Sequence, residues 1–118
     1  MGFFDNLGSM VKNLGFNAVS LEEAQRSAPQ QTGVYKLFLN GRLMKVGKAA
    51  WDAGIRWRMQ QYWRGDSTAG SYGSEIYKNR KDITVSWILC PKDKCRAIEL
   101  NQIQSAGGID NLPWCERI

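Results

Sequence analysis

Histidine is absent from this 118-residue sequence, and its absence removes several kinds of catalytic site. A Ser-His-Asp triad needs an imidazole base, and many metal-dependent nucleases need imidazole ligands. Any general base must therefore be Tyr, Lys, Glu, Asp or a water molecule. The sequence also has no P-loop and no dinucleotide-binding glycine motif, so the glycine-containing stretch at 70–73 predicts only a loop.

Cysteine is scarce, and the three present do not form the pattern of a secreted, disulfide-linked domain. Cys90 and Cys95 are separated by four residues, a wider spacing than in most zinc knuckles, so free thiols are expected instead of a zinc site. No apolar run is long enough to cross a membrane, and neither a signal peptide nor a myristoylation motif is recognised. We therefore expect a cytoplasmic protein that does not bind a membrane.

Positive charge is concentrated in one part of the chain. The net charge is +5, and between residues 36 and 64 a single acid, Asp52, lies among these basic residues: Lys36, Arg42, Lys45, Lys48, Arg56, Arg58 and Arg64. Trp51, Trp57, Tyr62 and Trp63 lie among them. Such a mixture suits phosphate contact and base stacking, but it also fits a solvated helix face over a core of aromatic residues. For Trp57 and Trp63, packing is favoured over base stacking.

The spacing of apolar residues predicts an α/β (α+β) fold. Strands are predicted at Thr32–Leu39, 42–47 and 82–90, with the two-residue turn Asn40-Gly41 joining the first two. Helices are predicted at 1–16, from the Ser20 capping box to Pro29, at 52–63 with Asp52 as N-cap, at 74–80 and at 94–106. We therefore expect a small, mainly antiparallel three-stranded sheet flanked by helices.

Two segments are distinguished along the chain. Residues 1–30 are predicted to be an N-terminal helical extension, and residues 31–118 the main domain. The amphipathic pattern of residues 1–16 suits packing on the domain's own core, but it also suits binding of a partner protein or self-association.

Four short motifs, in order, resemble those of the GIY-YIG nucleases. Gly33-Val34-Tyr35 and, ten residues later, Lys45-Val46-Gly47-Lys48-Ala49 resemble the two strand motifs of the family. Residues 58–64 resemble the Arg-x3-Tyr-aromatic-Arg segment of the excision-repair nuclease branch, and Arg96-Ala97-Ile98-Glu99 resembles the helix that bears an acidic metal ligand. The likeness, closest to the N-terminal domain of that branch, spans roughly 32–115. It implies a GIY-YIG-like fold and metal-dependent hydrolysis of phosphodiester bonds.

The resemblance also implies roles for individual residues. Glu99 would bind the divalent cation, and a lone carboxylate suits Mg²⁺, which keeps several waters, or Mn²⁺. Tyr35 would orient or deprotonate the attacking water, Arg58 would hold the scissile phosphate and Tyr62 would supply a second phenol. Lys48 would add a cation to the site. We expect further nucleic-acid contacts from other basic residues of the same segment: Lys36, Lys45, Arg56 and Arg64.

The second strand motif departs from the family at Lys45, which stands where its first tyrosine is expected. If the two-residue turn sets the register, Lys45 lies opposite Lys36. Like charges directly opposed are unfavourable unless an anion lies between them or both side chains reach solvent. A phosphate between the two lysines would resolve the conflict, and Lys45 would take part in proton transfer if its pKa fell.

Two further departures affect the site more than the fold. Asn111 lies twelve residues after Glu99, which matches the spacing of a late asparagine in the excision-repair branch. The local pattern instead aligns that asparagine with Cys115, in Pro113-Trp114-Cys115. Three more residues separate Lys48 from Arg58 than in that branch.

The sequence therefore favours a metal-dependent endonuclease that acts on nucleic acid, with DNA preferred over RNA. The alternatives are a catalytically inactive GIY-YIG-like module that binds nucleic acid, and a protein–protein adaptor that uses residues 1–16. The nuclease interpretation requires that these residues converge: Tyr35, Lys48, Arg58, Tyr62 and Glu99.

Overall fold

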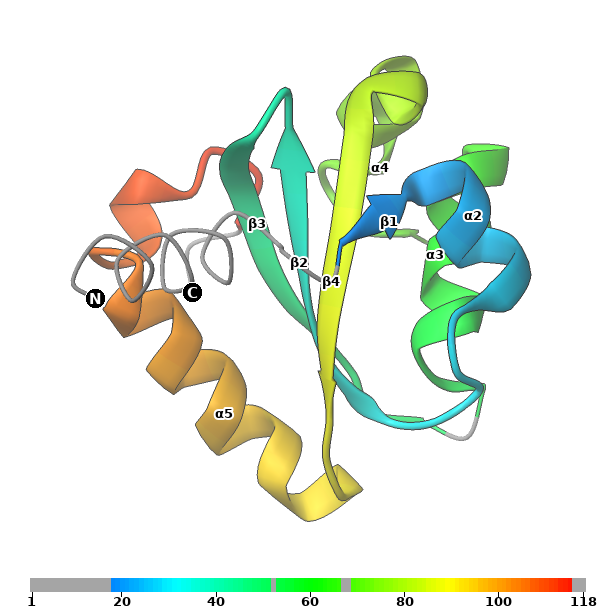
Figure 1. The fold of residues 1–118 in the computed structure, drawn as a ribbon. Helices are drawn as coiled ribbons and strands as arrows, with labels where there is room; N and C mark the ends of the chain where they lie inside the picture. Colours follow the sequence, from blue (N-terminus) through cyan, green and yellow to red (C-terminus); the bar gives the residue numbers. More distant parts are fainter. Residues whose placement is uncertain (1–17, 52, 67–68, 116–118) are drawn as a thin grey trace, which may run out of the picture.

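The computed structural model describes residues 18–51, 53–66 and 69–115. These residues form a four-stranded sheet with helices on both faces (Figure 1). The strands are β1 (Val19–Ser20), β2 (Gly33–Leu39), β3 (Arg42–Ala49) and β4 (Ile83–Leu89), in the order β1-β4-β2-β3, and all neighbours are antiparallel. The predicted α+β class and antiparallel sheet are confirmed.

The predicted number of strands was too low by one, because β1 was missed. Val19 pairs with Val85 and Ser20 pairs with Thr84, which extends the sheet beyond β4. A strand of two residues is too short to produce an alternating pattern of apolar and polar residues. Only its pairing with β4 identifies it.

The helices are α2 (Leu21–Ser27), α3 (Gly54–Arg64), α4 (Gly73–Lys78) and α5 (Lys92–Ser105), with two 3-10 turns at Arg80–Asp82 and Ile109–Asn111. Ala53 is the N-cap of α3 and provides no side-chain cap, while Asp52, predicted for that position, lies outside the described residues. So does the helix predicted at 1–16. None of the described helices combines the length and the apolar character that crossing a membrane requires.

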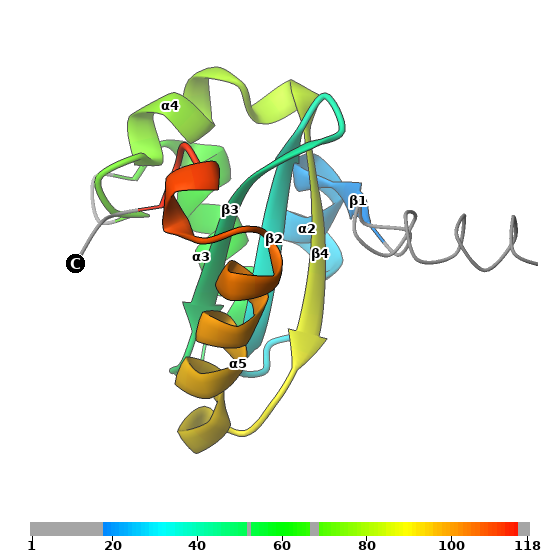
Figure 2. The same cartoon turned by 90° about the vertical axis from the view of Figure 1, so that its left-hand side faces the viewer.

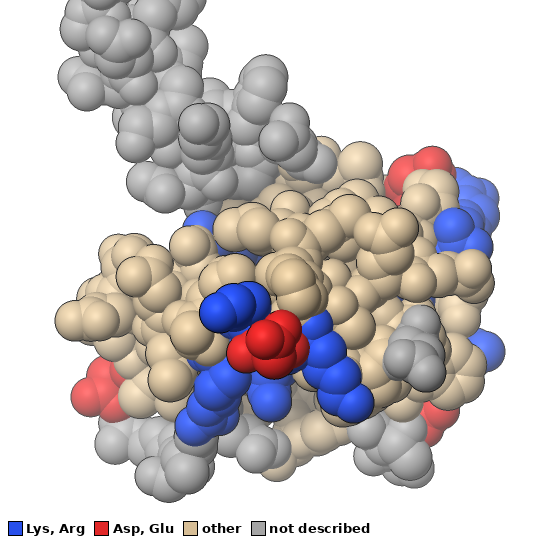
Figure 3. Space-filling view, turned by 90° about the horizontal axis from the view of Figure 1, so that it is seen from below, with Lys and Arg blue, Asp and Glu red and all other residues tan. Residues whose placement is uncertain are grey.

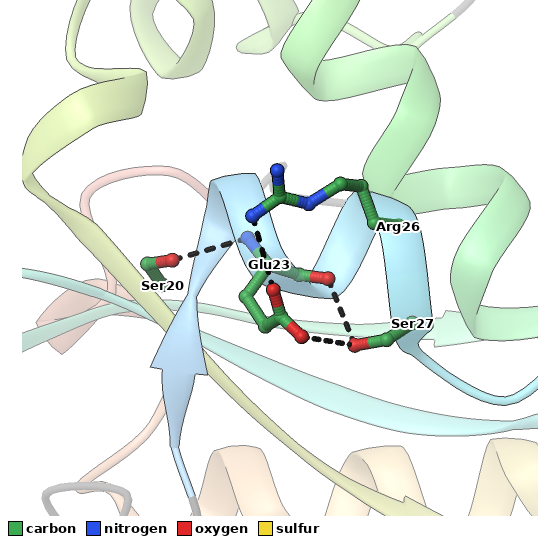
Figure 4. A network of polar contacts seen from close by, with 4 residues as sticks. All are labelled: Ser20, Glu23, Arg26 and Ser27. Carbon is green, nitrogen blue, oxygen red and sulfur yellow. Dashed lines mark hydrogen bonds and ion pairs between the residues drawn. The ribbon is translucent and has the colours of Figure 1, made fainter.

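One of the two hydrogen bonds of the predicted capping box is present at the start of α2. The Ser20 Oγ accepts a hydrogen bond from the Glu23 N–H at 3.1 Å, as an N-cap should. The Glu23 carboxylate accepts hydrogen bonds from Ser27 at 3.0 Å and Arg26 at 3.1 Å (Figure 4). Both bonds lower the pKa of Glu23, and the bond from Ser27 has the larger effect. The network therefore fixes both ends of a helix only seven residues long.

The two faces of the sheet bury different side chains. The face that carries Tyr35 and Leu37, here called the α3 face, packs against α2 and α3, and its cluster includes Leu21, Ile55 and Met59. The face that carries Val34 and Val46, here called the α5 face, packs against α5. The cluster on the α5 face is smaller; its buried members are Val34, Val46, Cys95, Leu112 and Cys115.

A β-bulge separates the hairpin turn from the rest of β3. Asn40 (φ 50°) and Gly41 (φ 84°) form the predicted two-residue turn. Phe38 then pairs with Leu43 but Leu37 pairs with Lys45, so Met44 is an extra residue in β3.

The predicted pairing of Lys45 with Lys36 is therefore wrong. The bulge shifts the register by one residue, so Lys36 lies opposite Val46 and Lys45 lies opposite Leu37. Met44 is buried in the cluster of the α3 face, and this burial provides a physical reason for the shift. No pair of opposed lysines remains for a phosphate to bridge.

The segment that follows α5 covers the outer edge of β3. The Trp114 N–H donates to the Met44 carbonyl at 2.9 Å, and the Lys45 Nζ donates to the Trp114 carbonyl at 3.1 Å. The Cys115 Sγ lies 3.5 Å from the backbone N of Val46 and 3.4 Å from its carbonyl oxygen. Polar groups at this sheet edge are thus paired within the chain, which limits pairing with another strand.

Candidate functional site

The predicted site residues meet at strand β3, which is an edge of the sheet. Figure 2 shows β3 between α5, in front of the sheet, and α3, behind it. Tyr35 comes from β2, Lys48 from β3 and Glu99 from α5, while Arg58 and Tyr62 come from α3. The site therefore combines side chains from both faces of the sheet.

Two tyrosines form the buried part of the site. The hydroxyl oxygens of Tyr35 and Tyr62 lie 2.7 Å apart and share a hydrogen bond, and the rings meet edge to face with centroids 6.1 Å apart. The residues are only 2% and 1% exposed. A Cβ atom added at Gly47 would lie 2.5 Å from both the Cζ and the hydroxyl oxygen of Tyr35. Glycine at this position therefore allows the Tyr35 ring to lie directly against β3.

Charges from both sides of the sheet act on the Tyr35 hydroxyl. Burial raises the pKa of Tyr35 well above its usual value of 10.0, and the neighbouring Tyr62 raises this pKa further. Arg58 lowers the pKa of Tyr35, and Glu99 raises it. Tyr35 is thus protonated at neutral pH. Arg58 and Glu99, which come from opposite faces of the sheet, therefore both act electrostatically on this hydroxyl.

Arg58 has an unsatisfied donor, which its rival Arg56 lacks. The Arg58 Nε is buried and has no hydrogen-bond partner within the described residues, and its guanidinium lies 4.8 Å from the ring centroid of Trp51. The Arg56 Nε instead donates to the Ala28 carbonyl at 2.7 Å and ties α3 to the end of α2. A buried unpaired donor is unfavourable, and this feature distinguishes Arg58 from Arg56.

Glu99 is a mostly buried carboxylate with cations around it. Its side chain is 14% exposed, and the Arg96 guanidinium lies 3.9 Å from one carboxylate oxygen. Burial raises the pKa of Glu99, while Lys48, Arg96 and Lys45, in that order, act to lower it. Figure 3 shows, at the end of the molecule where α5 begins, basic side chains around an acidic one.

A fully protein-ligated metal centre is not present among the described residues, because no three acidic or cysteine side chains gather there to hold a metal ion. A single carboxylate fits a different kind of cation, one that keeps most of its waters and shares substrate oxygens, as Mg²⁺ does. A bound divalent cation would also offset the unfavourable burial of the Glu99 charge. The donor set therefore fits one hydrated divalent cation.

The lysines predicted for the site occupy different surroundings. Lys48, opposite Val34, and Lys45 both act on the Glu99 carboxyl. Lys36 lies opposite Val46 in the central part of the sheet, where burial lowers its pKa. Lys45 and Lys48 are thus the lysines that the structure brings toward Glu99.

The two positions considered for the late asparagine differ in their surroundings. Asn111 is exposed, and its Nδ2 donates to the Ala106 carbonyl at 3.2 Å, so it holds the end of α5. Cys115 is buried; its burial raises its pKa, and the charges of Lys45 and Glu99 act on it. Cys115 therefore lies in the electrostatic field of the site, with a thiol where the family resemblance implies an amide.

Sequence reasoning missed two contributors to the site. Trp51 lies under the Arg58 guanidinium, a contact that their spacing of seven residues around the start of α3 could have indicated. The Trp114 carbonyl, which accepts from Lys45, had no sequence signal, because the contact spans sixty-nine residues. The cysteines are free, as predicted, with the sulfurs of Cys90 and Cys95 3.2 Å apart.

Comparison with known proteins identifies the fold. No protein-family model matches the sequence, and no curated protein matches it. The structure resembles the crystal structure of the GIY-YIG N-terminal endonuclease domain of UvrC from Thermotoga maritima, a point mutant bound to its catalytic divalent cation. The TM-score is 0.60 at 16% sequence identity, over 82% of this chain and 96% of that domain. This chain therefore has a GIY-YIG-like fold.

Proposed function

We propose that this chain is an endonuclease that hydrolyses phosphodiester bonds in nucleic acid, and DNA more than RNA. Glu99 would bind one divalent cation, Mg²⁺ or Mn²⁺. The observation that carries the proposal is the convergence of Arg58 and Glu99, from opposite faces of the sheet, on the Tyr35 hydroxyl. The similar UvrC domain is an endonuclease with a catalytic divalent cation, which supports the same activity here.

Arg58 would bind the scissile phosphate. Its buried Nε lacks an acceptor within the described residues, and a phosphate oxygen supplies one. A guanidinium donates two parallel hydrogen bonds to a phosphate, which fixes the phosphate's orientation as well as its position. Lys48 and Lys45, whose charges reach Glu99, would neutralise the charge that develops on the phosphate during hydrolysis.

The two phenols would position the attacking water. Since Tyr35 is protonated at neutral pH, it serves as a hydrogen-bonding group and not as a base by itself. The hydrogen bond to Tyr62 holds its hydroxyl oxygen in place. When bound, a divalent cation stabilises negative charge on the phosphate and lowers the pKa of a coordinated water. Of the two roles that the sequence left open for Tyr35, orienting the attacking water or deprotonating it, we therefore propose the first.

Cleavage of labelled single- and double-stranded DNA and RNA, with Mg²⁺, with Mn²⁺ and with EDTA, tests the proposal. Glu99→Gln keeps the shape of the side chain and removes the negative charge, and Arg58→Ala removes the phosphate ligand. Each should reduce the rate about 100-fold or more. Glu75→Gln is the matched control, since Glu75 is an exposed acid on α4. Cleavage that persists in Glu99→Gln, or that survives EDTA, contradicts the proposal.

A catalytically inactive nucleic-acid-binding module is the second candidate, and two observations favour it. Lys45 replaces a tyrosine and donates to the Trp114 carbonyl, and Cys115 replaces an asparagine if the local pattern sets the alignment. Binding that weakens with salt, without cleavage in any metal, would establish this alternative. Absence of both binding and cleavage would leave the adaptor proposed for residues 1–16. A reducing cytoplasm, the location we propose, suits the free cysteines.

A further inference from the structure

Two tryptophans at α3 expose much of their ring surface. Trp51, just before the helix, is 45% exposed and Trp57 is 38% exposed. An arginine lies over each ring, seven residues further along the chain: Arg58 lies 4.8 Å from the Trp51 centroid, and Arg64 lies 5.4 Å from the Trp57 centroid. Trp51, Trp57, Arg58 and Arg64 together are called the tryptophan surface.

The neighbouring Trp63 shows that exposure is not a general property of the tryptophans on this helix. Trp63 is partly buried against the core of the α3 face, with Arg80 over its ring at 5.3 Å. Packing, which the sequence favoured for Trp57 and Trp63, thus holds for Trp63, whereas Trp57 is exposed. Exposed apolar surface rimmed by polar groups is typical of sites where a partner binds.

The charge of this surface selects an anionic partner. Helix α3 carries three arginines and contains no Asp or Glu. The Arg58 Nε lacks an acceptor within the described residues. Exposed aromatic rings with arginines over them match a polyanion that also carries flat, stackable groups, which is the chemistry of a nucleic-acid strand.

The order of the residues relates this surface to the candidate site. Arg58 stacks on Trp51 and directly follows Trp57 in α3, so both exposed tryptophans are neighbours of the proposed phosphate ligand, one by contact and one along the helix. A tryptophan can stack on a base only where that base is not stacked between its neighbours in a duplex. The tryptophan surface therefore fits a strand with unpaired bases beside the bound phosphate.

We propose that the tryptophan surface binds single-stranded nucleic acid, with bases stacked on Trp51 and Trp57 and the backbone held by Arg58 and Arg64. The inference rests on the proposed function only for the statement that Arg58 holds the scissile phosphate. The substrate class is then a single strand, or an unpaired segment of a duplex. Because every base has a stackable face, binding is largely independent of sequence.

Binding to a labelled 12-nucleotide single strand of mixed sequence, and to the duplex of the same sequence, tests this inference. The full chain is used with EDTA, so that cleavage does not interfere. Trp57→Ala should weaken single-strand binding about tenfold and leave duplex binding unchanged. Trp51→Ala should weaken single-strand binding at least as much, because it also removes the ring beneath Arg58. The salt dependence of Trp57→Ala should match that of the wild type, because no phosphate contact is lost, whereas Arg64→Gln should lower the salt slope by about one.

Two controls make the result specific. Trp57→Phe keeps an aromatic face and should retain most of the single-strand affinity, while Leu100→Ala removes an equally exposed apolar side chain from α5 and should have no effect. The inference is overturned if Trp57→Ala and Trp51→Ala leave single-strand binding unchanged, or weaken single-strand and duplex binding equally. Far-UV circular dichroism of each variant separates loss of binding from loss of folding.

The same proteins distinguish this inference from the proposed function. If the wild type binds the single strand through both tryptophans but cleaves nothing with Mg²⁺ or Mn²⁺, the stacking surface stands and the nuclease proposal fails. The opposite result is that the wild type cleaves, and that Trp57→Ala and Trp51→Ala cleave single strands equally fast at substrate concentrations below saturation. In that case the nuclease proposal stands and the stacking surface fails.

Discussion

The two faces of the sheet differ in what they bury. The α3 face holds the larger apolar cluster, and its buried polar atoms near the site include the paired hydroxyls of Tyr35 and Tyr62 and the Nε of Arg58. The α5 face holds a smaller cluster, and half-buried Lys36, Lys48 and Glu99 lie on that side. The α3 face thus has the larger apolar core, while the α5 face has the smaller core and more half-buried charged side chains. The candidate site lies at β3, where the two faces meet.

This difference indicates how the proposed chemistry is divided. The α3 side supplies rigid aromatic side chains and the arginine proposed to bind phosphate. The α5 side supplies the carboxylate proposed to bind the cation, at a position where burial raises its pKa. Charged groups are costly to bury, so they are tolerated where a ligand later compensates them. Changes on the two faces should therefore have different consequences.

The largest expected difference is in core stability. Leu37→Ala removes a fully buried side chain from the centre of the α3 face and should lower the free energy of unfolding by about 3–5 kcal/mol. Leu112→Ala makes the same change on the α5 side, in the segment after α5, which can relax more; about 2–3 kcal/mol is expected. Urea unfolding of both variants measures the difference. Equal or reversed costs would break the comparison of the two faces.

A smaller effect is expected from Gly47→Ala, which acts at the boundary between the faces. The new Cβ would lie 2.5 Å from the Tyr35 ring, so the ring must move, at about 1–3 kcal/mol in the free energy of unfolding. Because the hydroxyl pair is displaced, the cleavage rate should fall by more than the loss of folded protein accounts for. Urea unfolding and the cleavage rate, measured on the same preparation, test both statements.

A double-mutant cycle isolates the cause of the Gly47→Ala effect. If the cost comes from the Tyr35 ring, combining Gly47→Ala with Tyr35→Ala should cost less than the sum of the two single changes. Strict additivity would mean that the added methyl group strains β3 itself and not the contact with Tyr35.

The smallest expected effect is the pH dependence of stability contributed by Glu99. Its pKa is raised in the folded protein, so between the unfolded and folded pKa values the folded state binds more protons and stability falls as pH rises. Without metal, Glu99→Gln should therefore be more stable than the wild type at pH 7. This advantage should shrink as the pH falls through the raised folded pKa and disappear at about pH 3, below the unfolded pKa, where the carboxyl is protonated in both states.

Added Mg²⁺ sharpens this test. A cation bound to the folded wild type raises its stability by mass action, while Glu99→Gln gains nothing. Thermal unfolding of each protein is measured with and without Mg²⁺, at pH 7 and at about pH 3, and Glu75→Gln serves as the control. A wild type that is more stable than Glu99→Gln at pH 7 without metal would show that the nearby lysines outweigh the burial.

Much of the fold was accessible from local sequence patterns. The Asn40-Gly41 turn, the N-cap at Ser20 and the glycines that end α5 depend on neighbouring residues alone, and the structure has each of them. The order of the motifs from Gly33 to Glu99 was also enough to predict a GIY-YIG-like fold. These features are local because turns, caps and amphipathic periods are properties of a few consecutive residues.

The sequence alone determined which chemical groups are available: no imidazole, a basic and aromatic α3, and one acid at position 99 in a helix. Tertiary structure decided how they are placed. The bulge at Met44 set the true partners of Lys45 and Lys36, and packing covered part of Trp63 but left Trp57 exposed. It also left the Arg58 Nε without an acceptor within the described residues. These outcomes depend on burial and on contacts between distant segments, which no local pattern encodes.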